Sequence, residues 1–355
     1  MIGPCERCER NSFALQLVGG HLEAMKASWR PRSVLALEAD ELVARVAGRN
    51  SAKLAMALDR FEYGAWRASS PASSIQAACR HQGDFPFPSA LEVDPEPPWS
   101  IWLLGSQAIL AGLEGMAAGV VGARRADGYG TAVARDLGRS VARAGGTVIS
   151  GLAFGIDAAA HKGALDVPDG RTVAVTGGGV DVVYPKAHRS LHQQIVERGS
   201  VISEMPPGSA LWRWSFPARN RLIAALSSAV VVVQGERRSG SLHTAEAALS
   251  RSIQVCAVPG RIDSVISEGP NQLLADGAAV VTGADSLLQI LGLETRQPTE
   301  SLSDDLKRVV IAVKEGRLAH YLAATDPTVS AAALARLELV GVLEVTADGG
   351  WRLVG

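Results

Sequence analysis

The chain has 355 residues, of which 47% are hydrophobic and 20% are charged, a balance typical of a globular protein with two or three domains. Its formal net charge of −1 excludes a bulk electrostatic clamp for nucleic acid, so any site for a polyanion has to be a local patch. No apolar run reaches the length of a membrane span and the N-terminus lacks a signal-peptide core, so we expect a cytoplasmic protein that does not bind membranes and keeps its thiols reduced.

Residues 1–98 are expected to form a helical N-terminal region with a proline-rich linker at its end. Apolar residues recur near helical spacing from about residue 10 to residue 80, and glycines and a proline interrupt them. Prolines crowd the segment 84–98, which predicts an extended linker and a domain boundary. A small helical interaction domain is the simplest interpretation.

Three cysteines and one histidine of this region are candidate metal ligands. Cys5 and Cys8 form a C-x-x-C pair, and Cys79 and His81 offer two further groups. Four such ligands can make a structural zinc site. A lone C-x-x-C near a terminus is a weak signal, and the C-x-H spacing is tighter than the usual second pair. Unrelated reduced thiols are therefore the favoured interpretation and zinc is the alternative, while Cys256 is expected in a buried strand.

Residues 99–293 carry the pattern of a doubly wound α/β domain. Short apolar segments rich in β-branched residues alternate there with helical patterns. Their continuous hydrophobicity indicates strands that are covered on both faces, as in the mostly parallel sheet of a Rossmann-like fold. The expected strands are 118–122, 147–150, 172–176, 200–203, 229–233, 255–258 and 279–281.

Residues 299–355 are expected to form a winged-helix-like domain. Apolar spacing predicts one helix over 306–313 and a second over 331–337. An alternating pattern follows over 341–354 around an Asp-Gly-Gly turn, which predicts a β-hairpin. Because the second helix is rich in alanine and poor in positive charge, association with a partner or with another copy is as well supported as contact with DNA.

Four loops at the carboxyl ends of the expected strands are rich in glycine or polar residues. In open α/β sheets ligands bind at this edge, and glycine lets backbone amides approach an anion closely. The sequence therefore favours an anion-binding edge over plain turns. The glycines expected to line it are Gly122, Gly151, Gly177, Gly178 and Gly240.

These loops lack the residue sets of familiar enzymes. The chain has no dinucleotide-binding fingerprint, P-loop or nucleophile elbow. Asp157 is expected to be a helix N-cap rather than a catalytic acid, and His161 to be hydrogen-bonded rather than a base. Ser239 and Ser241 fit a helix cap and a phosphate contact equally well. The sequence therefore favours binding over catalysis.

Arginines and aromatic residues are interleaved in the segment 212–221, and no acidic residue occurs over 212–233. Several phosphates of one strand suit this many arginines better than a mononucleotide does. Aromatic rings stack on single-stranded bases at about 1–3 kcal/mol per base, although packing in the core is the alternative for each ring. The residues concerned are Trp212, Arg213, Trp214, Phe216, Arg219 and Arg221.

The order of the motifs resembles one known family. The motifs include Val-Val-Gly-Ala-Arg124, Ser150-Gly-Leu-Ala-Phe-Gly-Ile-Asp157, Gly-Gly-Gly-Val-Asp181-Val-Val-Tyr-Pro185, Phe216-Pro-Ala-Arg-Asn-Arg and Ser239-Gly-Ser-Leu-His-Thr. Over about 119–292 they are similar to the DNA-processing protein A (DprA/Smf) family. The resemblance implies a Rossmann-like, homodimeric protein that binds single-stranded DNA, protects incoming DNA in natural transformation and loads the RecA recombinase, with no required cofactor and no enzymatic activity.

The resemblance also implies which residues contact DNA. Ala123, His188 and Gln234 depart from residues common in the family, which bears on affinity more than on fold. An enzyme of the related phosphoribohydrolase type is the alternative, because 240–246 partly imitates its nucleotide-binding loop; a protein-interaction scaffold is a third. The implied DNA contacts are Arg124, Lys186, Arg213, Phe216, Arg219, Asn220, Arg221, Ser239, Gly240 and Ser241.

Overall fold

The structure is a computed structural model of the chain. Residues Met1–Leu293 form one compact unit and Glu294–Gly355 form a second. None of the helices in the described ranges combines the length and the hydropathy that a membrane crossing requires. The structure describes residues 3–25, 35, 37–60, 74–113, 116–293, 304–339, 342–346 and 350–353.

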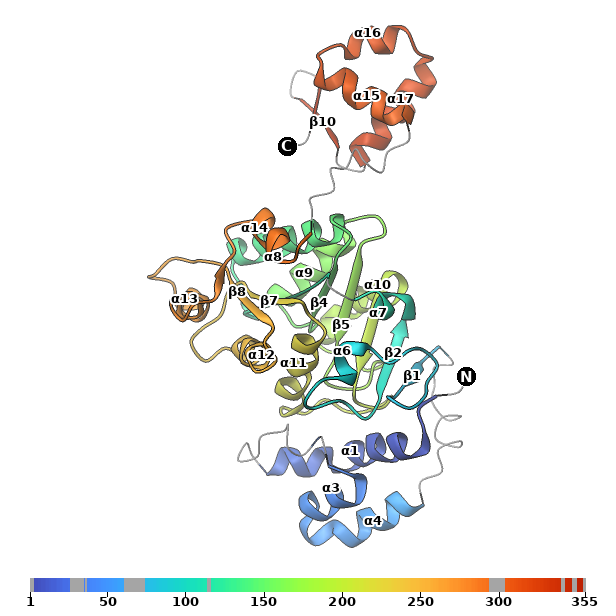
Figure 1. Cartoon of the computed structure of the whole chain (residues 1–355), viewed down its shortest axis with the longest axis vertical. Helices are drawn as coiled ribbons and strands as arrows, with labels where there is room; N and C mark the ends of the chain where they lie inside the picture. The colour runs from blue at the N-terminus through green and yellow to red at the C-terminus, as the bar shows by residue number, and fades with distance from the viewer. Residues whose placement is uncertain are drawn as a thin grey trace. The chain divides into compact units, whose positions relative to one another are not determined.

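A nine-stranded sheet forms the centre of the first unit, in the order β1-β2-β6-β5-β4-β3-β7-β8-β9 (Figure 1). From β6 along this order to β9 all neighbouring strands are parallel, whereas the pairs β1–β2 and β2–β6 are antiparallel. The predicted mostly parallel α/β sheet is therefore confirmed, with all seven expected strands present. The strands are β1 Gln76–Ala78, β2 Ile101–Gly105, β3 Ala117–Val121, β4 Thr147–Ser150, β5 Arg171–Val175, β6 Ser200–Ser203, β7 Ala229–Val232, β8 Gln254–Ala257 and β9 Ala279–Val280.

Helices cover both faces of the sheet, which explains why its strands are apolar throughout. In β3, Val121 lies in the core on one face and its neighbour Val120 in the core on the other. The first core includes residues of α7 and α11, and the second includes residues of α8 and α9. The helices of this part are α6 Ser89–Glu92, α7 Gln107–Ala111, α8 Gly128–Arg143, α9 Ile156–Leu165, α10 Arg189–Arg198, α11 Ser215–Ala225, α12 Gly240–Leu249, α13 Glu268–Ala275 and α14 Ala284–Ile290, with short 3₁₀ helices η2 Lys186–His188 and η3 Val265–Ser267.

Residues 74–98 differ from the expected helix and extended linker, because part of this segment packs on the sheet. The three residues of β1 lie within it and pair with β2, and strands this short carry too little pattern to be predicted. Leu91 of α6 lies in the first core, together with residues of α7 and α11. The carboxylate of Asp94 accepts two hydrogen bonds from the buried Arg251 guanidinium, at 2.6 and 2.9 Å. These contacts fix the proline-rich segment against the α/β part.

The N-terminal helices α1 Glu6–Ala24, α3 Ala39–Val46 and α4 Ser51–Asp59, with η1 Gly48–Asn50 between the last two, share a core of their own. This core also takes in Met205 and Ala218 of the α/β part. The indole Nε1 of Trp214 donates to the Gly19 carbonyl of α1 at 3.0 Å. Trp212 lies against the same glycine, where a Cβ atom would collide with its indole nitrogen. Both tryptophans therefore pack against α1, so for these two rings the structure supports packing within the protein rather than stacking on bases.

The described residues of the second unit contain three helices and a two-stranded antiparallel sheet. The helices are α15 Asp304–Lys314, α16 Leu318–Ala323 and α17 Pro327–Leu339, and strand β10 Leu343–Val345 pairs with β11 Trp351–Leu353. The two expected helices and the strand pair are present, and α16 is additional. The turn residues Asp348 and Gly349 lie outside the described residues. A winged-helix-like domain stays a prediction.

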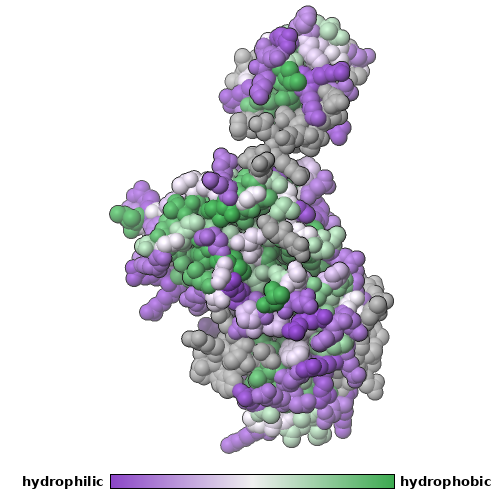
Figure 2. Space-filling model, viewed as in Figure 1, coloured by the Kyte–Doolittle hydropathy of each residue, from purple (hydrophilic) through white to green (hydrophobic). Residues whose placement is uncertain are grey.

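Hydrophobic residues gather on one region of the surface of the first unit. Figure 2 shows them over the region that Figure 1 labels α12 and α13. Large apolar side chains that are exposed in this part of the chain include Leu249, Ile262, Val265 and Val280. Apolar residues that gather on a surface are often a contact site for another protein.

Candidate nucleic-acid interface

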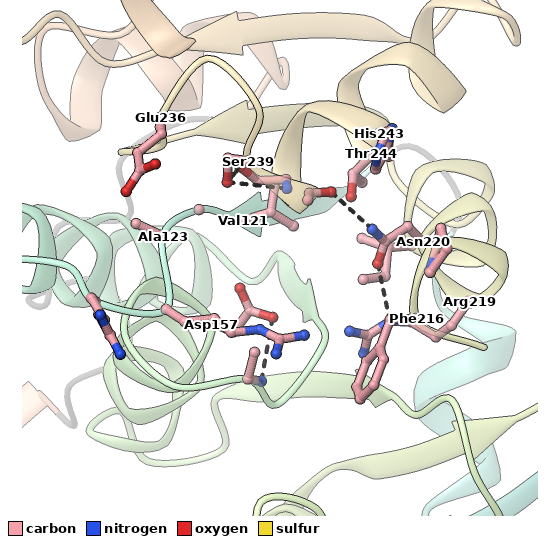
Figure 3. A pocket seen from close by; sticks show the side chains of 18 of the residues that line it. Val121, Ala123, Asp157, Phe216, Arg219, Asn220, Glu236, Ser239, His243 and Thr244 are labelled. Atoms are coloured by element: carbon pink, nitrogen blue, oxygen red, sulfur yellow. Dashed lines mark hydrogen bonds between the residues drawn. The ribbon is translucent and has the colours of Figure 1, made fainter. Parts of the chain in front are cut away.

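A cavity of about 400 Å³ lies at the carboxyl ends of β3, β4 and β7. Figure 3 shows Phe216 and Asn220 approaching it from α11, and Ser239 and Thr244 from the start of α12. A smaller cavity adjoins it toward the loop after β5. Because Arg124, Ala153, Phe216 and Arg219 line both cavities, the two form one groove, which we call the edge groove.

Most of the predicted DNA contacts line the edge groove. Those from α11 follow from helical spacing, since residues 216, 219, 220 and 223 share one helix face. The residues that line it as expected are Gly122, Arg124, Gly151, Gly177, Phe216, Arg219, Asn220, Ser239, Gly240 and Ser241. The predicted residues that line neither cavity are Gly178, Lys186, Arg213 and Arg221.

Arg221 points away from the edge groove, which departs from the expectation for this residue. Its side chain is only 1% exposed, and its guanidinium forms an ion pair with the buried Glu204 carboxylate. Two residues along a helix are about 200° apart, so Arg219 and Arg221 lie on nearly opposite faces of α11. Burial raises the pKa of Glu204, and the positive charge of Arg221 opposes this effect. Arg221 thus helps to pack α11 against the residue that follows β6.

The other three predicted residues outside the groove differ in their surroundings. Arg213 is exposed, and its backbone N–H donates to the Glu23 carboxylate of α1 at 2.8 Å. Lys186 is exposed and directly follows Pro185, which lines the smaller cavity. Gly178 packs against the carbonyl of Ser209. The charged ends of Arg213 and Lys186 thus have no ion pair within the described part of the chain, and Gly178 is a packing residue.

A buried pair of opposite charges, Asp157 and Arg219, forms the floor of the edge groove. Arg219 donates to the carbonyl oxygens of Gly151 at 2.6 Å and of Val175, at the ends of β4 and β5. Burial lowers the pKa of Arg219 to about 10, while the charge of Asp157 opposes this change. Burial likewise raises the pKa of Asp157, opposed by Arg219. Arg219 therefore supplies a fixed positive charge beneath the groove and cross-links two strand ends.

Asp157 does not cap its helix. The N-cap of α9 is Gly155, whose φ of 74° suits glycine, and Asp157 lies in the first turn. Its carboxylate instead accepts hydrogen bonds from the N–H groups of Gly151 at 3.1 Å and Ala153 at 3.4 Å. The predicted N-cap is therefore wrong, since the side chain reaches back to the preceding loop.

Close packing explains why two of the loop residues are glycine. A Cβ atom on Gly151 would collide with the Arg219 guanidinium, and one on Gly122 would lie 2.6 Å from Cγ1 of Ile156. Neighbouring loops also bond to one another, because the Ala123 N–H donates to the Gln234 carbonyl at 2.7 Å. The glycines thus allow the loops to pack together, which is a different reason from the predicted close approach of an anion.

Aromatic rings and the exposed Arg124 line the open side of the groove. The Arg124 guanidinium lies over the Phe216 ring, 4.9 Å from its centroid. The Tyr184 ring lies 5.6 Å from that of Phe216, and Tyr184 and Phe154 are 47% and 46% exposed. These last two rings are not among the predicted contacts, although aromatic residues inside glycine-rich loops are a usable signal. The groove therefore offers ring faces beside a cation.

Ser239 caps a helix and also lines the groove, so the two interpretations of this residue are compatible. Its side chain accepts from the Ser241 N–H at the start of α12, and the two hydroxyl oxygens lie 2.8 Å apart. Thr244, which the sequence analysis missed, lines the same wall. Its buried hydroxyl has no hydrogen-bond partner within the described part of the chain. The positive end of α12 and these hydroxyls suit a phosphate group.

His161 is a buried histidine of α9, as expected, rather than a base. Its Nδ1 lies 2.7 Å from the Thr172 hydroxyl, which itself donates to the Val148 carbonyl, so Nδ1 carries the proton. Burial lowers the pKa of His161 to about 3, and the charges of Arg219 and His188 act in the same direction. His161 is therefore neutral and structural near neutral pH.

Comparisons with known proteins identify the family of this chain. Residues 78–292 match the family model described as DNA recombination-mediator protein A. DNA processing protein DprA of Bacillus subtilis is 34% identical over 233 residues, which are 64% of this chain and 77% of that protein. The X-ray structure of DNA processing protein A from Streptococcus pneumoniae superposes with a TM-score of 0.63 and 28% identity, covering 81% of this chain and 96% of that chain. A structure of DNA processing protein A from Helicobacter pylori, which concerns its single-stranded DNA binding mode, gives a TM-score of 0.53 and 28% identity over 58% of this chain and 93% of that chain.

Proposed function

The chain belongs to the DNA recombination-mediator protein A family, and on this premise we propose that it binds single-stranded DNA in the edge groove without catalysing a reaction on it. The observation that carries the proposal is the position of Arg124 over the Phe216 ring at the mouth of the groove. A guanidinium beside a ring face suits a phosphate next to an unpaired base.

The distribution of charge around the groove supports a strand of several nucleotides. Arg124 and Arg125 are exposed and line the main cavity. Arg237 and Arg238 are also exposed and lie between two lining residues, Glu236 and Ser239. With Lys186 and Arg213, six exposed cations lie on or next to lining segments, although the whole chain is nearly neutral. This local excess suits a polyanion better than a single nucleotide.

The preference for single strands follows from the rings that line the groove. Phe154, Tyr184 and Phe216 can stack only on bases that are not already stacked and paired within a duplex. Duplex DNA would meet the arginines but not the rings. We therefore expect single strands to bind more tightly than duplex of the same length.

The test is fluorescence anisotropy of a labelled oligo-dT with the full chain over a range of salt concentrations. The slope of log K against log salt should lie between about −1.4, for two phosphate contacts, and about −4, for six. A duplex of equal length should bind more weakly. Salt-independent binding, or equal affinity for duplex, would refute the proposal. Release of free base from a nucleoside monophosphate would support the phosphoribohydrolase alternative instead.

Two further roles rest on the family alone. We propose that the chain protects incoming DNA and loads RecA onto it, which strand-exchange assays with RecA on DNA covered by a single-strand-binding protein would measure. We also propose a homodimer, and the exposed apolar residues Leu249, Ile262, Val265 and Val280 give it a candidate surface. Light scattering of wild type and Ile262→Lys would test this, because a charge in an apolar interface should yield monomers.

A further inference from the structure

The fold brings together four metal-ligand side chains that lie far apart in the sequence. The sulfur atoms of Cys5, Cys8 and Cys79 and a ring nitrogen of His81 all lie within 4.8 Å of one another. Cys5 and Cys79 are 74 positions apart, so only the folded chain creates this cluster. It lies outside the edge groove, whose lining includes none of these residues.

The distances within the cluster match those of a tetrahedral metal site. Zinc bonds of about 2.3 Å to sulfur and about 2.0–2.1 Å to nitrogen place tetrahedral ligands about 3.8 Å apart for two sulfurs and about 3.5 Å apart for sulfur and nitrogen. The Sγ atoms of Cys5 and Cys79 are 3.8 Å apart. Nδ1 of His81 lies 3.4 Å from Sγ of Cys5 and of Cys8, and 3.9 Å from Sγ of Cys79. A disulfide needs sulfurs about 2 Å apart, and all these cysteines are free.

Two short backbone segments present the ligands. Cys5 occupies the N-cap position of α1 in extended conformation, and Cys8 lies in the first helical turn, so the C-x-x-C pair projects from one end of the helix. Cys79 and His81 lie in the tight turn after β1, where the Cys79 N–H donates to the Gln82 carbonyl at 2.8 Å. Gly83 closes this turn against Ala78, where a Cβ atom would collide.

Hydrogen bonds hold these two segments together independently of the four ligands. The Asp84 carboxylate accepts from the N–H of Gly3 at 3.1 Å and from the N–H of Ala77 at 3.1 Å. The Cys5 N–H also lies 3.4 Å from Sγ of Cys79. An N–H group that points at sulfur favours the thiolate, which is the form that binds metal. These contacts therefore fix the two ligand segments next to each other.

We propose that Cys5, Cys8 and Cys79, as thiolates, and His81, through Nδ1, bind one structural Zn²⁺ ion. Three sulfurs and one imidazole complete a tetrahedral zinc site and leave no open position for a substrate. The ion joins the start of α1 to the turn after β1, and thereby attaches the N-terminal helices to the sheet edge. This inference is independent of the proposed DNA binding, because the ligands are not in the edge groove.

The experiment measures zinc in the full chain after purification in metal-free buffer. Elemental analysis and native mass spectrometry should give about one zinc per chain for the wild type. Cys8→Ser should lose most of this zinc. Cys256→Ala, which removes the cysteine outside the cluster, should retain it. His81→Cys should also retain zinc, since four cysteines form an equally good structural site.

Two measurements on the wild type keep the proposal testable even if Cys8→Ser does not fold. Cobalt(II) added to the zinc-depleted full chain should produce the visible absorption of tetrahedral thiolate coordination, and zinc should displace it. Removal of zinc with a chelator should lower the midpoint of thermal unfolding. A wild-type chain that stays zinc-free after incubation with zinc, full zinc content in folded Cys8→Ser, or an intact mass two hydrogens short from a disulfide would each overturn the proposal.

Discussion

Replacing Arg221 should damage stability and leave DNA binding intact, although sequence reasoning groups this residue with the DNA contacts. In Arg221→Met, the Glu204 carboxylate stays buried but loses its partner. Breaking a buried ion pair from one side costs about 3–5 kcal/mol. For a unit of this size 1 kcal/mol corresponds to about 2 °C, so the melting temperature should fall by about 6–10 °C.

The pH dependence provides an independent check on the cause. Burial holds the folded-state pKa of Glu204 above its ordinary value, so the folded state binds the proton more tightly than the unfolded state does. The contribution of the Glu204 carboxyl to the free energy of unfolding is therefore lost as pH rises from the ordinary pKa of glutamate through the folded-state pKa of Glu204. Without Arg221 that pKa rises further, so the deficit of Arg221→Met should be larger at pH 8 than at pH 5.

Two assays decide between the packing role and a DNA-binding role for Arg221. Calorimetry or denaturant titration should show the destabilisation, and the double variant Arg221→Met/Glu204→Leu should recover most of it because no unpaired charge remains. Anisotropy with oligo-dT should give the wild-type salt slope for both variants wherever they are folded. A folded Arg221→Met with a shallower slope and normal stability would refute this assignment.

Three further outcomes are expected. Arg124→Ala should make the salt slope shallower by about 0.7 and lower the affinity for all DNA sequences alike. The control Arg139→Ala removes a cation of α8 that is paired with Asp166, and it should change neither the slope nor the affinity in the same titration. Phe216→Ala should weaken oligo-dT binding by about 5- to 150-fold without changing the slope, and wild-type affinity in that variant would mean that the ring only packs. The folded-state pKa of His161, about 3, lies below its ordinary value of 6.5, so the unfolded state takes up the proton first as pH falls through 6.5. Urea titrations should therefore show that the free energy of unfolding falls by up to about 3 kcal/mol between pH 6.5 and pH 4. His161→Gln should not show this loss.

The sheet could be predicted from the sequence because its central strands are covered on both faces. Continuous β-branched segments such as that of β7 have few alternatives in a globular chain. The antiparallel edge strand β1 lacks this signal. Three residues in β1 are too few to show a period, and its pairing with β2 depends on contacts between distant segments. Position in the sheet, rather than propensity, makes β1 a strand.

The candidate site was predictable as a set of loops but not residue by residue. The rule that ligands of open α/β sheets bind at the carboxyl ends of the strands places Gly122, Ser239 and their neighbours together, whatever their side chains. It cannot tell which side of α11 faces the groove, so Arg219 and Arg221 look equivalent in the sequence. Nor does it reveal that Trp214 packs on α1, since that contact joins residues 195 positions apart. Tertiary contacts decide these assignments.

The attachment of α1 to the start of α11 has a consequence for the entropy of binding. Glu23 of α1 accepts from the N–H groups of Arg213 and Trp214, just before the turn that carries Phe216. This backbone is therefore ordered in the absence of DNA, and the protein loses little conformational freedom there when a strand binds. The entropic cost falls instead on the nucleotide chain and on exposed side chains such as Tyr184. Differences in affinity between DNA sequences should then follow the stiffness of the strand, with flexible strands losing more freedom than strands already stacked in an extended form.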